Sequence, residues 1–228
     1  MNLFLILGLG LFLRIAYIIK PEGLWNDEYV SWAIASTPFN SGFWHEVLHQ
    51  CHMPLYYLYL KFFGDTELFL RLSSVLPNLF AIYIMYTIGK LHNKSMATCL
   101  GLITACTSFL VYYSQEVRFY SLLFLFSSLM LLFVIKYLKE NNRKNLFGYI
   151  ISAILVLLTH TIGFVYVFIT SLLLIIKSKK KRALIIASTA SIIMTIPFAI
   201  YIFTSVGTSQ WWGSFTYRNI IFMMFLFF

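Results

Sequence analysis

Two adjacent acids, Asp27 and Glu28, are the first residues whose types and spacing could do chemistry. They lie between aromatic residues in the segment Trp25-Asn26-Asp27-Glu28-Tyr29, in a chain of 228 residues of which only 11% are charged. A carboxylate placed beside a hydroxyl can act as a general base, which is typically worth about 10²–10⁴-fold in rate. The alternative is structural, because an Asp can cap a helix and the helix dipole favours a Glu in the first turn.

Three arginines could supply the positive charge that a phosphate group requires. Arg14 lies within the first apolar run, Arg71 begins the second, and Arg118 follows Glu116 in a short polar turn. A guanidinium presents paired donors that match phosphate oxygens. Because a charge at the centre of a span costs about 2.5–3.5 kcal/mol, we expect Arg14 to reach outward or to face a polar cavity. Glu116 and Arg118 could instead be a solvated surface pair.

The histidines suggest a metal ion less clearly. His45, His49 and His52 would share one face of a helix, as metal ligands can, but Pro54 disfavours helical backbone just before it. We therefore do not expect all three to bind one ion. His160 lies in an apolar stretch, where a polar side chain is a candidate functional residue. The sequence contains no phosphate-binding loop, dinucleotide fingerprint or HExxH motif.

The composition predicts what must position these residues. Hydrophobic residues make up 60% of the chain and the mean hydropathy is +0.81, which excludes an ordinary soluble domain. Several apolar runs approach the roughly 20 residues that a membrane-crossing helix needs. We expect an all-α, polytopic transmembrane bundle of about seven to eight spans. The net charge of +9 lies mostly in short loops between apolar runs, so the expected partner is the bilayer and not nucleic acid.

The expected spans share this apolar character and are separated by short polar segments. They are residues 3–19, 72–89, 96–113, 119–135, the run 146–176 divided in two at 159–163, residues 183–204, and the start of an eighth at 219–228. We expect residues 1–228 to form a single transmembrane domain. Because the last apolar run stops at Phe228, we also expect the chain to be an N-terminal portion of a longer protein.

The charges alternate from one side of these spans to the other. Loops after the second, fourth and sixth spans hold eleven of the seventeen basic residues and one acid, whereas residues 20–67 hold six of the eight acids. Basic loops stay in the cytoplasm. We therefore expect a multi-pass protein of the cell membrane with a cytoplasmic N-terminus and residues 20–67 as a large first external loop.

The first external loop is expected to contain short interfacial helices. Residues 26–35 would form one, capped by Asn26 or Asp27, and residues 43–50 would form another. The second helix would bury a set of apolar side chains, namely Phe43, Trp44, Val47 and Leu48.

Taken in order, these motifs resemble the GT-C membrane glycosyltransferases. The closest likeness is to the branch of protein O-mannosyltransferases, lipid A aminoarabinose transferases and bacterial core galacturonosyltransferases. It is carried, over essentially residues 1–220, by Asp27-Glu28, His52-Met53-Pro54-Leu55-Tyr56-Tyr57, Leu70-Arg71-Leu72-Ser73-Ser74, Tyr113-Ser114-Gln115-Glu116-Val117-Arg118-Phe119-Tyr120 and Thr159-His160. Met53 departs from the many relatives that have a second proline there.

The resemblance implies that a sugar is transferred from a polyprenyl-phosphate donor to a lipid, glycan or protein acceptor on the outer face of the membrane. It places Asp27 at the reaction centre, with Glu28 as the second catalytic residue. It places His52 and His160 near the donor phosphate, where they could bind a divalent cation, and no other cofactor is expected. The residues then expected to bind substrate or phosphate are Arg14, Arg71, Glu116, Arg118 and Tyr120.

Two other functions stay open at this point. A transporter or flippase for a lipid-linked glycan could line its path with the same acids and arginines. No inverted repeat of the spans is evident, however, and charged pairs do not recur deep in several spans. A non-catalytic membrane scaffold would explain a truncated chain, but it would not explain the order of the motifs.

Overall fold

The computed structural model describes residues 2–19, 23–49, 53–177 and 181–205, and all regular elements within these ranges are helical. The expected all-α class is confirmed. The elements are α1 (Leu3–Ile18), α2 (Asn26–Ser36), α3 (Ser41–His49), α4 (Leu55–Leu60), η1 (Lys61–Phe63), α5 (Glu67–Lys90), α6 (Lys94–Cys106), α7 (Ser108–Tyr113), α8 (Tyr120–Glu140), α9 (Arg143–Thr159), α10 (Ile162–Lys177) and α11 (Lys181–Ser205).

Two helices of the described part, α5 and α8, are long and apolar enough to cross a membrane by length and composition. Shorter apolar helices cover Leu3–Ile18, Lys94–Cys106, Ile162–Leu173 and Leu184–Pro197. The number of spans therefore stays a prediction. The eighth apolar segment lies outside the described residues.

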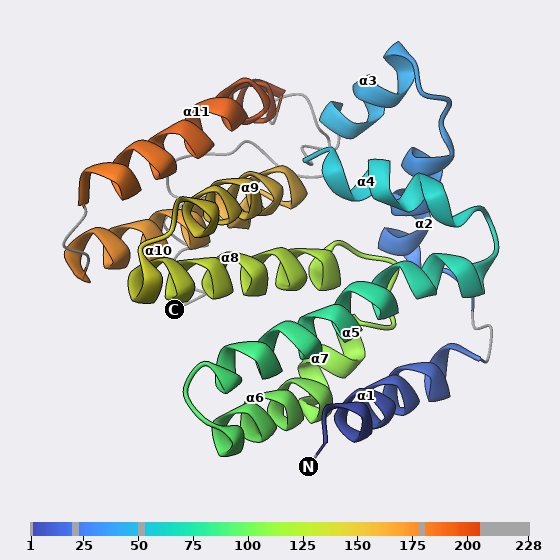
Figure 1. Cartoon of the computed structure of the whole chain (residues 1–228). Helices are drawn as coiled ribbons and strands as arrows, with labels where there is room; N and C mark the ends of the chain where they lie inside the picture. The colour runs from blue at the N-terminus through green and yellow to red at the C-terminus, as the bar shows by residue number, and fades with distance from the viewer. Residues whose placement is uncertain (1, 20–22, 50–52, 178–180, 206–228) are drawn as a thin grey trace, which may run out of the picture.

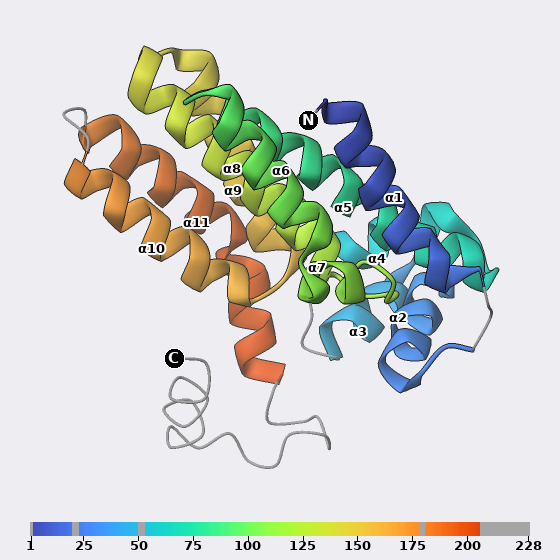
Figure 2. The ribbon, with the colours of Figure 1, turned by 90° about the horizontal axis from the view of Figure 1, so that it is seen from below.

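The long helices form one bundle. Helix α5 packs against α1, α6 and α8, and α8 continues the bundle to α9, which packs against α10 and α11 (Figure 1). The short helices α2, α3 and α4 gather at one end of this bundle, as Figure 2 shows. The described segments 23–49 and 53–66 thus cover one end of the long helices.

The predicted division of residues 146–176 is confirmed, because α9 ends at Thr159 and α10 begins at Ile162. The expected span 96–113 consists of two helices, α6 and α7, and its crossing of the membrane stays a prediction. Thr107 takes an extended backbone and separates α6 from α7, while its backbone N–H and its hydroxyl both donate to the Ile103 carbonyl. Such back-bonding by a threonine competes with regular helix geometry.

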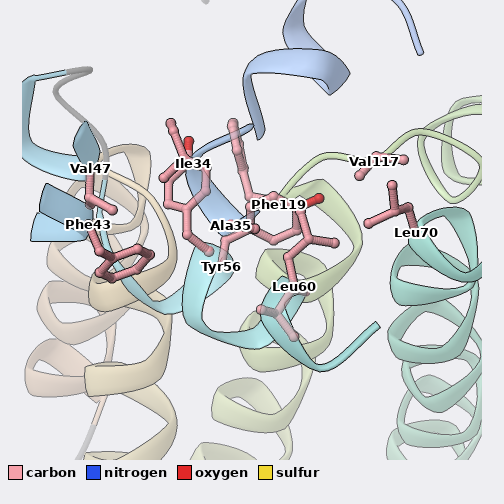
Figure 3. Packing of buried hydrophobic residues seen from close by; sticks show 11 residues of the cluster. Ile34, Ala35, Phe43, Val47, Tyr56, Leu60, Leu70, Val117 and Phe119 are labelled. Atoms are coloured by element: carbon pink, nitrogen blue, oxygen red, sulfur yellow. The ribbon is translucent and has the colours of Figure 1, made fainter. Parts of the chain in front are cut away.

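A hydrophobic cluster holds α2, α3 and α4 against the bundle (Figure 3). Phe43 and Val47 of α3 are fully buried, as predicted, and Trp44 is half-buried; the Leu48 side chain lies outside the described residues. The sequence did not predict α4 or η1. Lys61 links η1 to α2, since its ammonium donates to the carbonyls of Ala35 and Thr37 at the end of α2.

Close packing of α5 on α6 gives the fold a testable feature. A Cβ added at Gly89 would lie 2.5 Å from the Ala97 Cα, whereas one added at Gly8 of α1 would meet nothing within 4 Å. We expect Gly89→Ala to lower the free energy of unfolding by about 1–3 kcal/mol, as overpacking does, and Gly8→Ala to have little effect. Thermal unfolding of both variants in detergent tests this, and equal melting temperatures would contradict the packing.

Candidate active site

Three segments that are distant in sequence meet at the end of the bundle covered by α2. They are the start of α2, the first turns of α5 and the turn 114–119. The Glu28 carboxylate joins all three, because Oε1 accepts from Arg71 Nη1 at 2.9 Å and from the Val117 backbone N–H at 2.8 Å. These segments belong to the loops that the charge pattern placed on one side of the membrane.

Glu28 is fully buried. Its Oε2 accepts from the Trp25 backbone N–H at 3.2 Å and from Arg71 Nη2 at 3.3 Å. The contact with Trp25 explains why the predicted cap is wrong. The N-cap of α2 is Trp25, not Asn26 or Asp27, and Glu28 satisfies its N–H from inside the first turn. Buried in this way, Glu28 positions its neighbours and does not face solvent.

Arg71 has all five N–H donors engaged. In addition to its paired contact with Glu28, its Nε donates to Glu67 Oε1 at 2.9 Å, Nη1 to the Gln115 carbonyl at 2.6 Å, and Nη2 to the Gly23 carbonyl at 3.2 Å. In this geometry Arg71 holds the three segments together and has no N–H left for a phosphate.

The turn 114–119 is fixed by further contacts. The Ser74 hydroxyl donates to the Glu116 carbonyl, and Gln115 Nε2 donates to the Leu13 carbonyl of α1 at 3.1 Å. A turn held from both α1 and α5 presents its side chains in one fixed geometry, which a catalytic site requires. Sequence reasoning missed Ser74 and Gln115 as positioning residues, although both lie inside the motifs that carry the resemblance.

Asp27 and Arg118 form an ion pair beside the hydrogen bonds of Glu28 and Arg71. Arg118 Nη2 lies 3.3 Å from Asp27 Oδ2, and Nη1 donates to the Asp27 carbonyl at 3.2 Å. The Asp27 side chain is 44% exposed, whereas that of Arg118 is 11% exposed. Asp27 is therefore held by a cation, and its carboxylate is still partly open to solvent.

Aromatic rings surround the Arg118 guanidinium. Its carbon lies 5.2 Å from the centroid of Phe119 and 5.9 Å from that of Tyr120. The His160 ring stacks on Phe119 with centroids 3.8 Å apart, and its Nδ1 accepts from the Ile162 backbone N–H at 3.1 Å. The structure thus brings Asp27, Arg118, Tyr120 and His160 together.

Tyr57 and Glu116 lie close to this group. Burial raises the pKa of the Tyr57 phenol, the Arg118 charge lowers it and the Asp27 charge raises it, so Tyr57 stays protonated at neutral pH. The Glu116 side chain is largely buried, and this burial raises the pKa of its carboxyl. Tyr57 was part of the recognised motif but was not predicted as a site residue.

Arg14 lies apart from the site. It is fully buried within the bundle, and Asn78 Oδ1 accepts from its Nε at 3.0 Å and from Nη2 at 2.7 Å. Its other donors bind the carbonyls of Gly10, Ala105 and Thr104 at 2.9, 3.0 and 3.2 Å. Arg14 therefore does not reach outward, and it has no donor left for a phosphate.

The predicted metal ligands are only partly placed. His52 lies outside the described residues, so its approach to His160 stays a prediction. Within the described ranges, no group of three or more His, Cys, Asp and Glu side chains could hold a metal ion. The binding of a divalent cation by His52 and His160 therefore also stays a prediction.

Comparison with known proteins identifies the family. Residues 54–217 match the family of dolichyl-phosphate-mannose-protein mannosyltransferases. The chain belongs to this family. It is therefore a membrane glycosyltransferase of the GT-C type, as the resemblance indicated. The matched residues include Arg71, Glu116, Arg118, Tyr120 and His160, whereas Asp27 and its helix precede them. Comparisons with curated proteins and with solved structures gave no match.

Proposed function

We propose that the protein transfers a sugar from a polyprenyl-phosphate donor to the hydroxyl of a lipid, glycan or protein acceptor, at the outer face of the cell membrane. The observation that carries this proposal is the pair of Asp27 and Arg118. It places an exposed carboxylate 3.3 Å from a nearly buried guanidinium, in a chain of the mannosyltransferase family.

The two side chains suit the two halves of the transfer. Asp27 accepts the proton of the acceptor hydroxyl while the hydroxyl oxygen forms a bond to the anomeric carbon of the sugar. The bond between this carbon and the phosphate oxygen breaks, and the polyprenyl phosphate leaves with the electron pair. Arg118 stabilises the charge that develops on the phosphate. Phosphate leaves readily, so the transfer needs no second carboxylic acid of the kind that glycosidases use.

The buried arginines favour a transferase over a transporter. A path for a charged lipid headgroup would need charged side chains that face it, but the donors of Arg14 and Arg71 are all bound within the protein. The experiment that separates the functions uses the purified protein in liposomes with a radiolabelled polyprenyl-phosphate sugar. Transfer to an acceptor without lipid movement supports the proposal, and lipid movement without transfer contradicts it.

The proposed orientation has its own test. Ser41 begins α3 at the end of the bundle that holds Asp27, whereas His92 is exposed in the loop between α5 and α6. In a background without native cysteines, we expect a membrane-impermeant maleimide to label Ser41→Cys in intact cells and to label His92→Cys only after the cells are opened. The reverse result would place the site in the cytoplasm.

A further inference from the structure

Three buried polar side-chain atoms have no hydrogen-bond partner among the described residues, and they are Tyr56 Oη, Ser73 Oγ and Arg118 Nε. Leaving a buried polar atom without a partner is unfavourable, and most such atoms in native proteins are bound by protein, water or ligand. In the part of the chain that the structure describes, these atoms belong to residues close to the candidate active site. Their position makes a bound ligand one candidate partner for them, and an internal water is the other.

The three groups are neighbours. The Tyr56 ring of α4 is 1% exposed and meets the Phe119 ring edge-on, with centroids 6.4 Å apart. The Arg118 guanidinium lies 5.2 Å from the same Phe119 ring. The Ser73 hydroxyl of α5 interacts with the Tyr56 phenol and lowers its pKa, although the pair does not meet the geometry of a regular hydrogen bond.

All three groups can donate a hydrogen bond. Arg118 Nε can only donate, and the Tyr56 and Ser73 hydroxyls donate as well as accept. Burial raises the pKa of the Tyr56 phenol well above its usual value, so this phenol keeps its proton at physiological pH. The Asp27 carboxylate pairs with Nη2 of Arg118, which leaves the Nε side for another group. An oxyanion with several acceptor oxygens would satisfy all three donors.

We propose that Tyr56, Ser73 and the Nε side of Arg118 form a subsite that binds the phosphate group of a polyprenyl phosphate. The proposal deepens the proposed function and rests on it, because this phosphate is the leaving group of the sugar transfer. Tyr56 and Ser73 are then phosphate-binding residues, and they would stabilise the same charge as Arg118.

The test compares two tyrosines of the same helix. Tyr56→Phe removes a hydroxyl that has no partner, whereas Tyr59→Phe removes one that donates to the Ser73 carbonyl at 2.9 Å. We expect Tyr56→Phe to leave the melting temperature of the ligand-free protein unchanged or higher, and to weaken binding of farnesyl phosphate about 10-fold, because hydrogen bonds to charged groups are strong. Tyr59→Phe should lower the melting temperature and bind farnesyl phosphate as the parent chain does.

Calorimetric titration of the full chain in detergent measures binding, with farnesyl phosphate, farnesol and inorganic phosphate as probes. A loss confined to farnesyl phosphate supports recognition of a lipid phosphate, and a loss shared with inorganic phosphate supports recognition of the phosphate group itself. Unchanged binding of farnesyl phosphate by both Tyr56→Phe and Ser73→Ala would overturn the proposal. So would a melting temperature lowered as much by Tyr56→Phe as by Tyr59→Phe, since an internal water would then satisfy the hydroxyl.

The outcomes also separate this subsite from the proposed function. If the parent chain binds farnesyl phosphate through Tyr56 but transfers no sugar, the subsite stands and the transferase proposal fails. If the parent chain transfers sugar and Tyr56→Phe binds farnesyl phosphate normally, the transferase proposal stands and the subsite fails.

Discussion

Asp27→Asn should lower sugar transfer at least about 100-fold while the protein still folds. The change keeps the size of the side chain and removes the base, which is typically worth about 10²–10⁴-fold. The pair with Arg118 is partly exposed, and pairs of this kind contribute little to stability. Transfer assays on membranes, corrected for expression, give the rate, and thermal unfolding of the purified variant gives the stability.

Asp65→Asn is the matched control for this change. Asp65 lies in the same loop, is exposed, and accepts a hydrogen bond from Trp32 Nε1 at 3.1 Å. An asparagine oxygen can accept the same bond, so we expect near-normal transfer. If Asp27→Asn also transfers normally, Asp27 is not the base.

Arg71→Met should have the largest effect on stability. It would leave the Glu28 carboxylate fully buried without its cation, and breaking a buried pair costs about 3–5 kcal/mol. We expect a marked fall in melting temperature and the loss of transfer, because the turn 114–119 also loses its hydrogen bond from Arg71 to the Gln115 carbonyl. Arg143→Met, at an exposed position at the start of α9, should change the free energy of unfolding by about 0.5 kcal/mol or less.

A second variant distinguishes the effect of an unpaired buried charge from a general loss of structure. When Glu28→Leu accompanies Arg71→Met, no uncompensated charge remains, so we expect much of the stability to return. Transfer should stay low, because the Glu28 and Arg71 contacts that join α2, α5 and the turn are absent and, among the hydrogen bonds of the described residues, only the contacts of Arg118 with Asp27 still link α2 to the turn. Recovery of transfer in the double variant would show that the contacts of Glu28 and Arg71 do not position Asp27 and Arg118.

The sequence predicted those parts of the fold that depend on local pattern. The polar residues around His160 marked the break between α9 and α10, and the acids at the start of α2 marked that helix. The alternation of basic and acidic loops predicted that residues near Glu28, Arg71 and Val117 would lie at the same end of the bundle, and their hydrogen bonds show that they do.

The partners of the charged residues could not be predicted in this way. Glu28 and Arg71 are 43 positions apart, and periodicity does not say which acid meets which arginine. From sequence alone Arg14 and Arg71 looked like phosphate ligands, as Arg118 did. Only the arrangement in space shows that the first two are saturated by carbonyls, Asn78 and carboxylates, and that Arg118 keeps an unpartnered Nε.

The most direct test of the central claim is the stoichiometry of the reaction in liposomes. Purified protein is given a radiolabelled polyprenyl-phosphate sugar and an acceptor hydroxyl, and both the transferred sugar and the released polyprenyl phosphate are counted. The proposed transfer predicts one released phosphate for each sugar transferred by the parent chain, and neither product above background with Asp27→Asn. Sugar transferred equally well by Asp27→Asn, or phosphate released without transfer, would contradict the account.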